Sequence, residues 1–432
     1  MSPELIGLIG IIVLLILLAL KMWVGAAMLL VSTVGIIVLK GFNVAASIAG
    51  TSAFANLNSY TFTVIPMFTL MGMIIAESTM GADLYAAAYA WVGRFRGGLA
   101  SATVVACGIL GAITGSTNVS TIVIGKVAVP EMEKNHYDET FALGSVAAGA
   151  PLAILIPPSI GFIIYGILSD NSIGKLFMSG IGVGVVQIVL YIALIWFLCK
   201  LNPNIGPKGP KQTFKAMLKA LVKVIPILLL MILVLGGIYG GFFSTTQAGA
   251  IGAFGSIIIA FAFRQITVKK FYKALKDTAV MCGMVFFLVA STYLFVTFMS
   301  LSRVPMWLAK LIIGLDVPNW VIAVALIFVY FILGMFLPDV PMIVLTVPVF
   351  YSALMARGFD PIWLGAFVVK LMAMGGISPP VGMTVFTLAG AMQKKAGTVF
   401  KGVLPFLAVD IIILVLMIIF PDIATFIPNH MK

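Results

Sequence analysis

Two pairs of adjacent prolines, each inside an apolar segment long enough to cross a bilayer, constrain this fold most. Ile154 to Gly161 reads Ile-Leu-Ile-Pro-Pro-Ser-Ile-Gly, and Ser378-Pro379-Pro380-Val381-Gly382 repeats the device 222 residues later (157 to 379). Adjacent prolines remove backbone donors and clash with the preceding turn, so no continuous helix can pass through them. In hydrocarbon, broken backbone is tolerated only where it faces protein, an ion or water. We therefore expect two broken transmembrane helices, over 140–168 and 361–390, of the kind that builds transporter binding sites.

The composition places the chain among polytopic, all-α membrane proteins. Of its 432 residues, 62% are hydrophobic and only 9% are charged, which excludes a water-soluble globule. We attribute the net charge of +12 to loops on the cytoplasmic side of a membrane, and not to nucleic-acid binding. The chain has no nucleotide loop, Ser/His/Asp set or metal-type cluster, so we expect neither an enzyme nor a cofactor.

Two further segments, 98–130 and 319–350, each consist of two short apolar halves around a turn. The first turn is Thr114-Gly-Ser-Thr-Asn-Val-Ser120 and the second is Gly334-Met-Phe-Leu-Pro-Asp-Val-Pro341. Each half has about 12–15 residues, too few to span a bilayer at a rise of 1.5 Å per residue. The pattern predicts two re-entrant helical hairpins, each entering and leaving on one side of the membrane.

The order of these segments indicates an internal repeat. The first repeat is 1–199, a basic linker with six lysines and no acid covers 200–223, and the second repeat is 224–432. Placing this linker and the basic stretch 264–276 in the cytoplasm gives ten full spans and two hairpins. Both termini then lie on the outside. An odd number of spans separates equivalent points, so the two repeats are expected to have inverted topology.

The hairpin turns and the helix breaks are the candidate binding sites, because they gather hydroxyls, amides and freed carbonyls near the bilayer midplane. Unwound carbonyls and hydroxyl oxygens suit sodium ions. We predict a first sodium site from Gly115, Ser116, Thr117, Asn118, Pro157 and Ser159. We predict a second from Gly334, Pro338, Asp339, Gly376, Ser378 and Pro379. The alternatives are a packing turn whose hydroxyls bond their own backbone and, for Asp339, a structural cap.

Four residues are candidates for substrate binding. Ser116, Asn118 and Ser378 lie at the turns and breaks, where polar groups and helix ends can bind a carboxylate. Lys370 lies about 14 Å into its span at 1.5 Å per residue and could attract an acidic substrate. The competing interpretation is that Lys370 snorkels or pairs with another residue of the scaffold.

Several motifs together resemble the large membrane subunit of tripartite ATP-independent periplasmic (TRAP) transporters. They are Gly115-Ser116, Pro130-Glu131-Met132, Tyr137-Asp138, and Ile154 to Ser159 followed by Ile164-Tyr165-Gly166. The resemblance implies a sodium-driven, elevator-type transporter of the ion transporter superfamily in a bacterial inner membrane. It also implies two partners, a small four-span membrane subunit and a periplasmic substrate-binding protein. The implied substrates are organic acids such as C4-dicarboxylates and sialic acids.

Two other functions remain open at this point. The first is a stand-alone sodium-coupled dicarboxylate transporter or ion antiporter of the same superfamily. The second is a membrane-embedded enzyme, which the absence of a catalytic residue set disfavours.

For an elevator, we expect the hairpins and broken helices to form a moving unit. The first 20 residues of each repeat and the spans 177–199 and 403–421 are expected to form the scaffold. The weakly amphipathic stretches 82–96 and 303–316 should connect the two.

Overall fold

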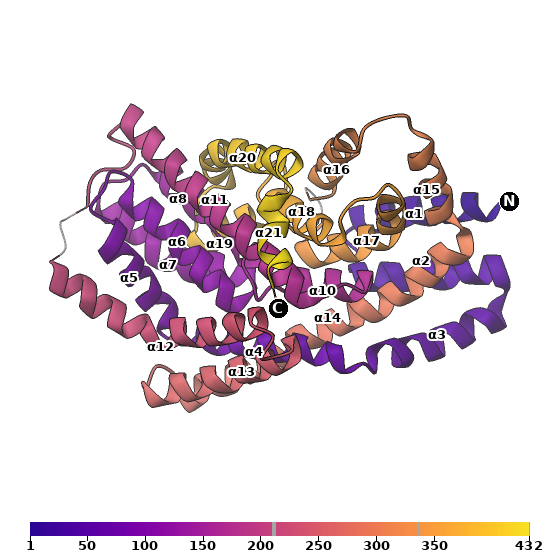
Figure 1. Cartoon of the computed structure of the whole chain (residues 1–432), viewed down its shortest axis with the longest axis horizontal. Coiled ribbons are helices and arrows are strands. Elements are labelled where there is room, and N and C mark those ends of the chain that lie inside the picture. The colour runs from indigo at the N-terminus through magenta and orange to yellow at the C-terminus, as the bar shows by residue number, and fades with distance from the viewer. Residues whose placement is uncertain (210–212, 335–336, 432) are drawn as a thin grey trace.

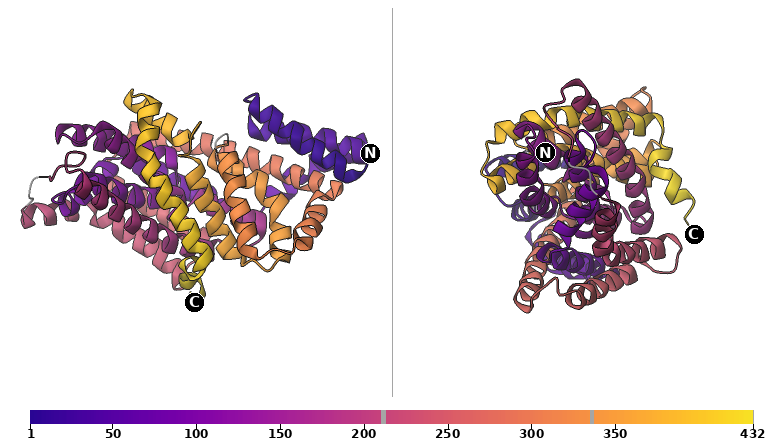
Figure 2. Two further views of the ribbon diagram at one scale, coloured as in Figure 1. Left: turned by 90° about the horizontal axis from the view of Figure 1, so that it is seen from above. Right: turned by 90° about the vertical axis from the view of Figure 1, so that its left-hand side faces the viewer.

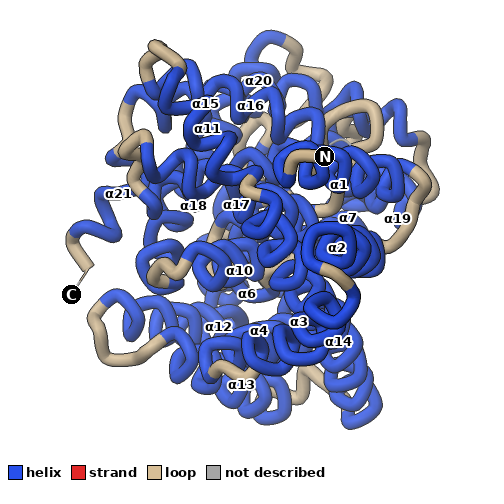
Figure 3. The backbone as a smooth tube through the Cα atoms, turned by 90° about the vertical axis from the view of Figure 1, so that its right-hand side faces the viewer, coloured by secondary structure: helices blue, strands red, loops and turns tan. Residues whose placement is uncertain are grey.

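The computed structural model describes residues 1–209, 213–334 and 337–431, and every regular element among them is a helix (Figures 1 and 3). Lys211 of the basic linker and residues 335–336 of the second turn lie outside the described residues. Eight of the described helical segments are long and apolar enough to cross a membrane. The chain is therefore an all-helical, multi-pass protein, as the composition predicts.

The helices form two groups that pack mainly within themselves. The first group, which we call the frame, comprises α1 (Pro3–Ala19), α2 (Val24–Lys40), α3 (Phe42–Leu57), the 3-10 helix η1 (Tyr60–Thr63), α4 (Val64–Glu77), α12 (Phe214–Tyr239), α13 (Thr245–Ala262) and α14 (Val268–Ser302). Within it, α14 packs against α2, α3 and α4, and α13 packs against α4 and α12. Figures 1 and 3 both show α12, α13, α14 and α3 in the lower part of the molecule.

The second group, which we call the inner bundle, contains both helix pairs and both broken helices. It comprises α6 (Gly98–Thr114), α7 (Thr117–Lys134), α8 (Glu139–Gly149), α9 (Leu152–Leu155), α10 (Ile160–Ser169), α11 (Ile173–Leu201), α16 (Asn319–Gly334), α17 (Asp339–Ala356), α18 (Pro361–Gly375), α19 (Met383–Met392), α20 (Ala396–Ile419) and α21 (Asp422–Asn429). Figure 2 shows the N-terminal helices at one end of the elongated molecule and the C-terminal helix near its middle.

Two helices, α5 (Met80–Val92) and α15 (Val304–Gly314), join the groups. Helix α5 packs on α12 of the frame and on α6 of the inner bundle, while α15 packs on α1 and α17. These helices occupy the two weakly amphipathic stretches at 82–96 and 303–316. Each stands directly before one helix pair, so each is placed to connect the frame to the inner bundle.

Three boundaries differ from the sequence prediction. Helix α3 was not predicted, because its asparagine, serine and threonine residues interrupt the apolar run. Helix α14 begins at Val268, so most of the basic stretch 264–276 is the first part of a 35-residue helix. The short α21 at the C-terminal end was also not predicted. For α14 the apolar run alone underestimated the helix, since helices extend beyond the hydrophobic part into polar flanks, whereas α3 and α21 lie outside the predicted apolar runs.

Helices α11 and α20 were predicted to belong to the scaffold, but both pack within the inner bundle. Helix α20 lies along α8, and α11 contacts α6, α18 and α20. Where α8 crosses α20, Gly144 and Gly402 face each other, and a methyl group on either would overlap the backbone of the other helix. Small residues allow this close approach in membrane proteins. The broken helices and the spans that follow them are thus one packed unit.

Replacing Gly402 by valine should lower the free energy of unfolding by about 1–3 kcal/mol, because the added atoms force α20 away from α8. Thermal unfolding of the detergent-solubilised chain measures the change. Gly397 is the matched control, since a Cβ there meets nothing within 4 Å. Gly397→Ala should be neutral or slightly stabilising, because alanine favours helix more than glycine. Equal loss in both variants would show that the α8–α20 contact has no special role.

Candidate functional site

The first helix pair places its turn against the first helix break. Gly115 ends α6 with a φ of 60°, and a Cβ on it would lie 2.8 Å from the carbonyl oxygen of Pro158. The break itself separates α9 from α10, and the Ser159 hydroxyl donates across it to the carbonyl of Ile154. The structure therefore brings Gly115, the Pro157-Pro158 pair and Ser159 together, as predicted for the first sodium site.

The hydroxyl and amide groups of the first turn differ in their surroundings. Ser116 caps α7, accepting a hydrogen bond from the backbone of Val119. Asn118 is exposed, and its side-chain oxygen accepts from Thr387 at 3.5 Å. Thr114 and Ser120 were not among the predicted ligands, yet both hydroxyls are buried without a hydrogen-bond partner among the described residues. Both oxygens are therefore available as acceptors beside the first turn.

The second helix pair meets the second break in the same way. Gly334 at the end of α16 lies against Gly375, where a Cβ would come within 2.5 Å of the Gly375 Cα. At the break, the Ser378 hydroxyl donates to the carbonyl of Met374 at 2.7 Å. The carbonyl of Gly376 accepts from the backbone of Thr384 at 2.9 Å. Pro379 follows in the turn before α19, so these predicted residues of the second sodium site also converge.

Asp339 connects the two turns. The Thr117 hydroxyl donates to Asp339 Oδ2 at 3.1 Å, and the two residues are 222 positions apart, the same separation as the proline pairs. The other carboxylate oxygen, Oδ1, lies 3.5 Å from the Cβ position of Gly376. Pro338 is the N-cap of α17 and makes no side-chain cap hydrogen bond. Asp339 thus faces the first turn and the second break, besides lying where the α17 dipole favours a negative charge.

Lys370 does not lie with the other candidate substrate residues. Its ammonium group is bound by Asp410 Oδ1 at 2.5 Å and Gln187 Oε1 at 2.7 Å. Tyr191 donates to the same Asp410 oxygen at 2.7 Å, and the Lys370 side chain is fully buried. Of the two interpretations of Lys370 in the sequence analysis, the structure therefore supports pairing with another residue and not attraction of a substrate. The network joins α18 to α11 and α20 and so holds the inner bundle together. The positive charge of Lys370 is neutralised by Asp410 and is not available to a substrate.

Both turn-and-break sites have the chemistry that a hard cation needs. Each gathers backbone carbonyls and hydroxyls in a buried setting, and Asp339 adds one carboxylate between them. Among the described residues, no group of three or more His, Cys, Asp or Glu side chains could hold a transition metal. Oxygen-only donors with one negative charge fit an alkali-metal ion better than zinc or copper.

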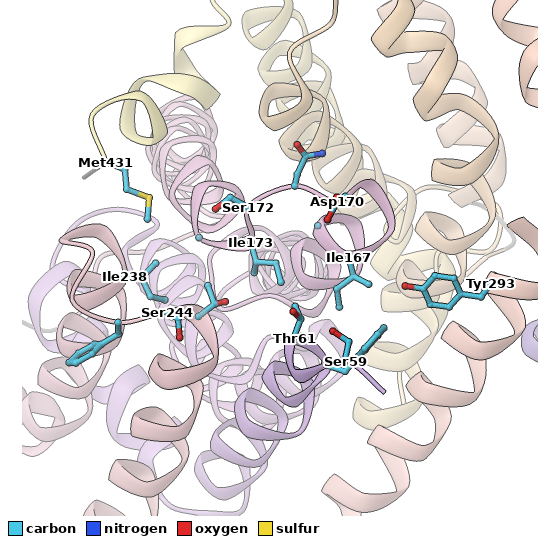
Figure 4. Close-up of a pocket in the computed structure, with 16 residues that line it drawn as sticks. Ser59, Thr61, Ile167, Asp170, Ser172, Ile173, Ile238, Ser244, Tyr293 and Met431 are labelled. Carbon is cyan, nitrogen blue, oxygen red and sulfur yellow. The ribbon is translucent and has the colours of Figure 1, made fainter. Parts of the chain in front are cut away.

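A separate polar cavity of about 630 Å³ lies between the two helix groups (Figure 4). Frame residues Ser59, Thr61 and Ser244 line one side, and the α10–α11 connection with Asp170 and Ser172 lines the other. None of the predicted sodium or substrate residues lines it. On the predicted topology the cavity opens toward the outside. It marks the boundary between the frame and the inner bundle.

Comparison with solved structures shows the fold. The chain is similar to the YdaH transporter of Alcanivorax borkumensis, with a TM-score of 0.66 over 87% of this chain and 88% of that one. The sequence identity is 14%, so this likeness concerns architecture alone.

Comparison with known sequences shows the family. Residues 11–423 match the family model described as tripartite ATP-independent periplasmic transporter, DctM component. The C4-dicarboxylate TRAP transporter large permease protein DctM of Pseudomonas aeruginosa is 30% identical over 377 residues, covering 87% of this chain and 88% of that protein. The ectoine TRAP transporter large permease protein TeaC of Halomonas elongata is 31% identical over 373 residues, with 86% and 87% covered. The chain therefore belongs to the DctM family of TRAP transporter large permease components.

Proposed function

We propose that this permease imports an organic acid of the C4-dicarboxylate or sialic acid class, driven by sodium ions bound at the two turn-and-break sites. The observation that carries the proposal is the meeting of the turn between α6 and α7, with its hydroxyl groups, and the first helix break. Gly115 brings this turn against the Pro158 carbonyl. A sodium ion there would be bound by hydroxyl oxygens of the turn and carbonyl oxygens of the break.

The substrate is expected between the two turns, near Ser116, Asn118 and Ser378. Asn118 is exposed and Ser116 is half-buried, so polar groups at the first turn are accessible. A sodium ion at each break would add positive charge beside an anionic substrate and so favour its binding. Relatives in the family are named for different substrates, including C4-dicarboxylate, ectoine and sialic acid. The proposed choice of an organic acid therefore rests on the acid-binding chemistry of the two sites.

Two partners complete the proposed transporter, in an inner membrane with both termini on the periplasmic side. A periplasmic binding protein would deliver the acid, and a four-span small subunit would cover part of the apolar surface. The frame offers such a surface, with Leu229 59%, Ile232 67% and Phe254 66% exposed. A stand-alone antiporter would need no partner, and the family relationship favours the tripartite arrangement.

We also propose an elevator movement, in which the inner bundle travels against the frame. The two groups pack mainly within themselves, and α5 and α15 connect them. A rigid inner bundle keeps both breaks satisfied while the site changes sides of the membrane. Unlike the initial expectation, the proposed moving unit includes α11 and α20, since Lys370 of α18 binds Gln187 of α11 and Asp410 of α20.

Replacing Thr114 by valine or Ser159 by alanine should raise the sodium concentration for half-maximal uptake about tenfold or more, since a polar ligand to a charge contributes about 1.5–3 kcal/mol. Uptake into proteoliposomes with the partner proteins measures it. Asn118→Ala and Ser378→Ala test the remaining predicted ligands in the same assay.

Ser256→Ala is the matched control, because this buried hydroxyl in the frame donates only to the carbonyl of Ala253. It should leave the sodium dependence unchanged. Uptake that does not need sodium at all would contradict the coupling proposal. Sodium-dependent uptake that is unaffected by Thr114→Val and Ser159→Ala would contradict only the assignment of the first site.

A further inference from the structure

A second cavity, of about 890 Å³, lies at the end of α11 and is lined by basic and aromatic side chains. Arg94 and Arg96, from the turn after α5, and Lys200 and Lys208, from the end of α11 and the start of the linker, supply four positive charges. Phe95 and Trp196 complete its lining with Gly209. No acidic side chain among the described residues lines this basic cavity. It therefore concentrates positive charge that no neighbouring carboxylate offsets.

The linker that carries Lys208 is fixed in place by hydrogen bonds. The amide of Gly97 donates to the carbonyl of Gly206 at 3.0 Å, and the amide of Gly209 donates to Gly93 at 3.2 Å. The Tyr137 hydroxyl donates to the carbonyl of Pro207 at 3.0 Å. The first part of the linker therefore lies across the N-terminal end of α6. Lys208 is held beside Arg94 and Arg96, so the cavity is built into the fold.

The aromatic residues indicate where the cavity lies relative to the lipid. Trp196 is 55% and Phe95 is 51% exposed, and the neighbouring Phe197 is 52% exposed on the same end of α11. The Lys200 ammonium lies 5.1 Å from the centre of the Trp196 ring, and the Arg94 guanidinium lies 4.8 Å from that of Phe95. Exposed aromatic rings beside lysine and arginine are typical of the membrane–water interface. The basic residues place this end on the cytoplasmic side.

We propose that the basic cavity binds the phosphate groups of an anionic phospholipid from the cytoplasmic leaflet. Phosphate oxygens accept hydrogen bonds from arginine and lysine, and basic pockets at this face suit lipid head groups. Four positive charges fit a head group with two phosphates, as in cardiolipin, better than a single phosphodiester. The acyl chains would then run along the exposed aromatic and apolar face at the end of α11. This lipid site is separate from the sodium and substrate sites.

The test is lipid binding to the full-length chain in detergent, followed by native mass spectrometry. Cardiolipin should bind at least about tenfold more tightly than phosphatidylcholine, and Arg94→Gln with Lys208→Gln should remove about tenfold or more of that affinity. The matched control is Lys215→Gln with Lys219→Gln, which removes two exposed lysines from α12 on the same predicted face. This control should change the affinity for cardiolipin less than about twofold, because exposed charges act only weakly through the screening salt.

A second pair, Arg96→Gln with Lys200→Gln, should reproduce the loss and guards against misfolding of the first. Equal loss in the α12 control would overturn the proposal, because it would show attraction to overall charge and not to this cavity. Displacement of cardiolipin by an equal concentration of inorganic pyrophosphate would overturn the lipid assignment in favour of a free phosphate compound. Unchanged binding in both cavity variants would also overturn it.

Discussion

Replacement of Lys370 by methionine is expected to destabilise the protein by about 3–5 kcal/mol, the cost of leaving a buried charge without its partner. Asp410 is 1% exposed and would keep only Tyr191 as a hydrogen-bond donor. Gln187 would lose its partner as well. Thermal unfolding of the solubilised chain gives the stability, and uptake gives the function. We expect both to fall together, because α18 carries the second break.

The double variant Lys370→Met with Asp410→Asn separates pairing from packing. Its asparagine is neutral, can accept from Tyr191 and can donate to Gln187, so no buried charge is left unpaired. We expect it to recover most of the stability lost in the single variant. Recovery of uptake as well would show that the lysine charge is not used to bind substrate. A stable double variant that no longer binds the acid would instead restore the substrate role to Lys370.

The network also relates the two halves of the chain. Gln187 and Asp410 occupy the same place in α11 and α20, fourteen residues after each helix begins (173 to 187 and 396 to 410). The ammonium group of Lys370 therefore lies between corresponding positions of the two halves. One lysine fixes how α11 and α20 sit against each other. Ions bound in either half would then act on the same packed unit.

The end of the inner bundle that is predicted to face the cytoplasm has a comparable contact. Lys394, in the connection from α19 to α20, forms ion pairs with Glu133 and Glu139 at 2.8 and 2.7 Å. These hydrogen bonds with two carboxylates raise the pKa of the Lys394 ammonium. These two ion pairs join the end of α7 and the start of α8 to the second half of the chain. The inner bundle is thus joined across its halves at the middle and at one end.

The helix breaks and the turns between the paired helices could be predicted from the sequence because their causes are local. Adjacent prolines break a helix wherever they stand. The turns at Gly115 and Pro338 separate halves that are visible as apolar runs. The predicted length of about 12–15 residues was wrong, because these helices have 16–18 residues and α17 is long enough to cross a membrane. The internal repeat was inferred from the 222 residues that separate the two proline pairs. Thr117 and Asp339, which form a hydrogen bond, are separated by the same number of residues. Local chemistry therefore located the candidate site.

What the sequence could not show depended on contacts between distant residues. The partner of Lys370 lies 40 residues away and Gln187 lies 183 residues away, and nothing local marks either. The packing of α11 and α20 against the broken helices could not be predicted for the same reason. Thr114 and Ser120 are the first and last residues of the turn that the sequence analysis identified. Their burial, which sets them apart from the exposed Asn118, needed the packed structure.

Cross-linking across the polar cavity of Figure 4 is expected to abolish uptake. Ser172 follows α10 in the inner bundle, and Ser244 precedes α13 in the frame, and both line this cavity. If the inner bundle moves along the membrane normal, a covalent link between the two groups must stop it. Cysteines at both positions, joined by a cleavable bifunctional maleimide, provide the link. The native Cys107, Cys199 and Cys282 are buried and should react slowly.

The matched control joins Ser59 to Ser244, which line the same cavity but both belong to the frame side. Its cross-link should leave uptake unchanged, because neither residue moves relative to the other. Cleavage of the reagent should restore uptake in the Ser172–Ser244 variant, which excludes damage by modification alone. Full uptake with the Ser172–Ser244 link in place would mean that the inner bundle does not travel. In that case the proposed sodium sites would have to open to each side by local movement of the two turns. Such a movement would change the contact between Thr117 and Asp339.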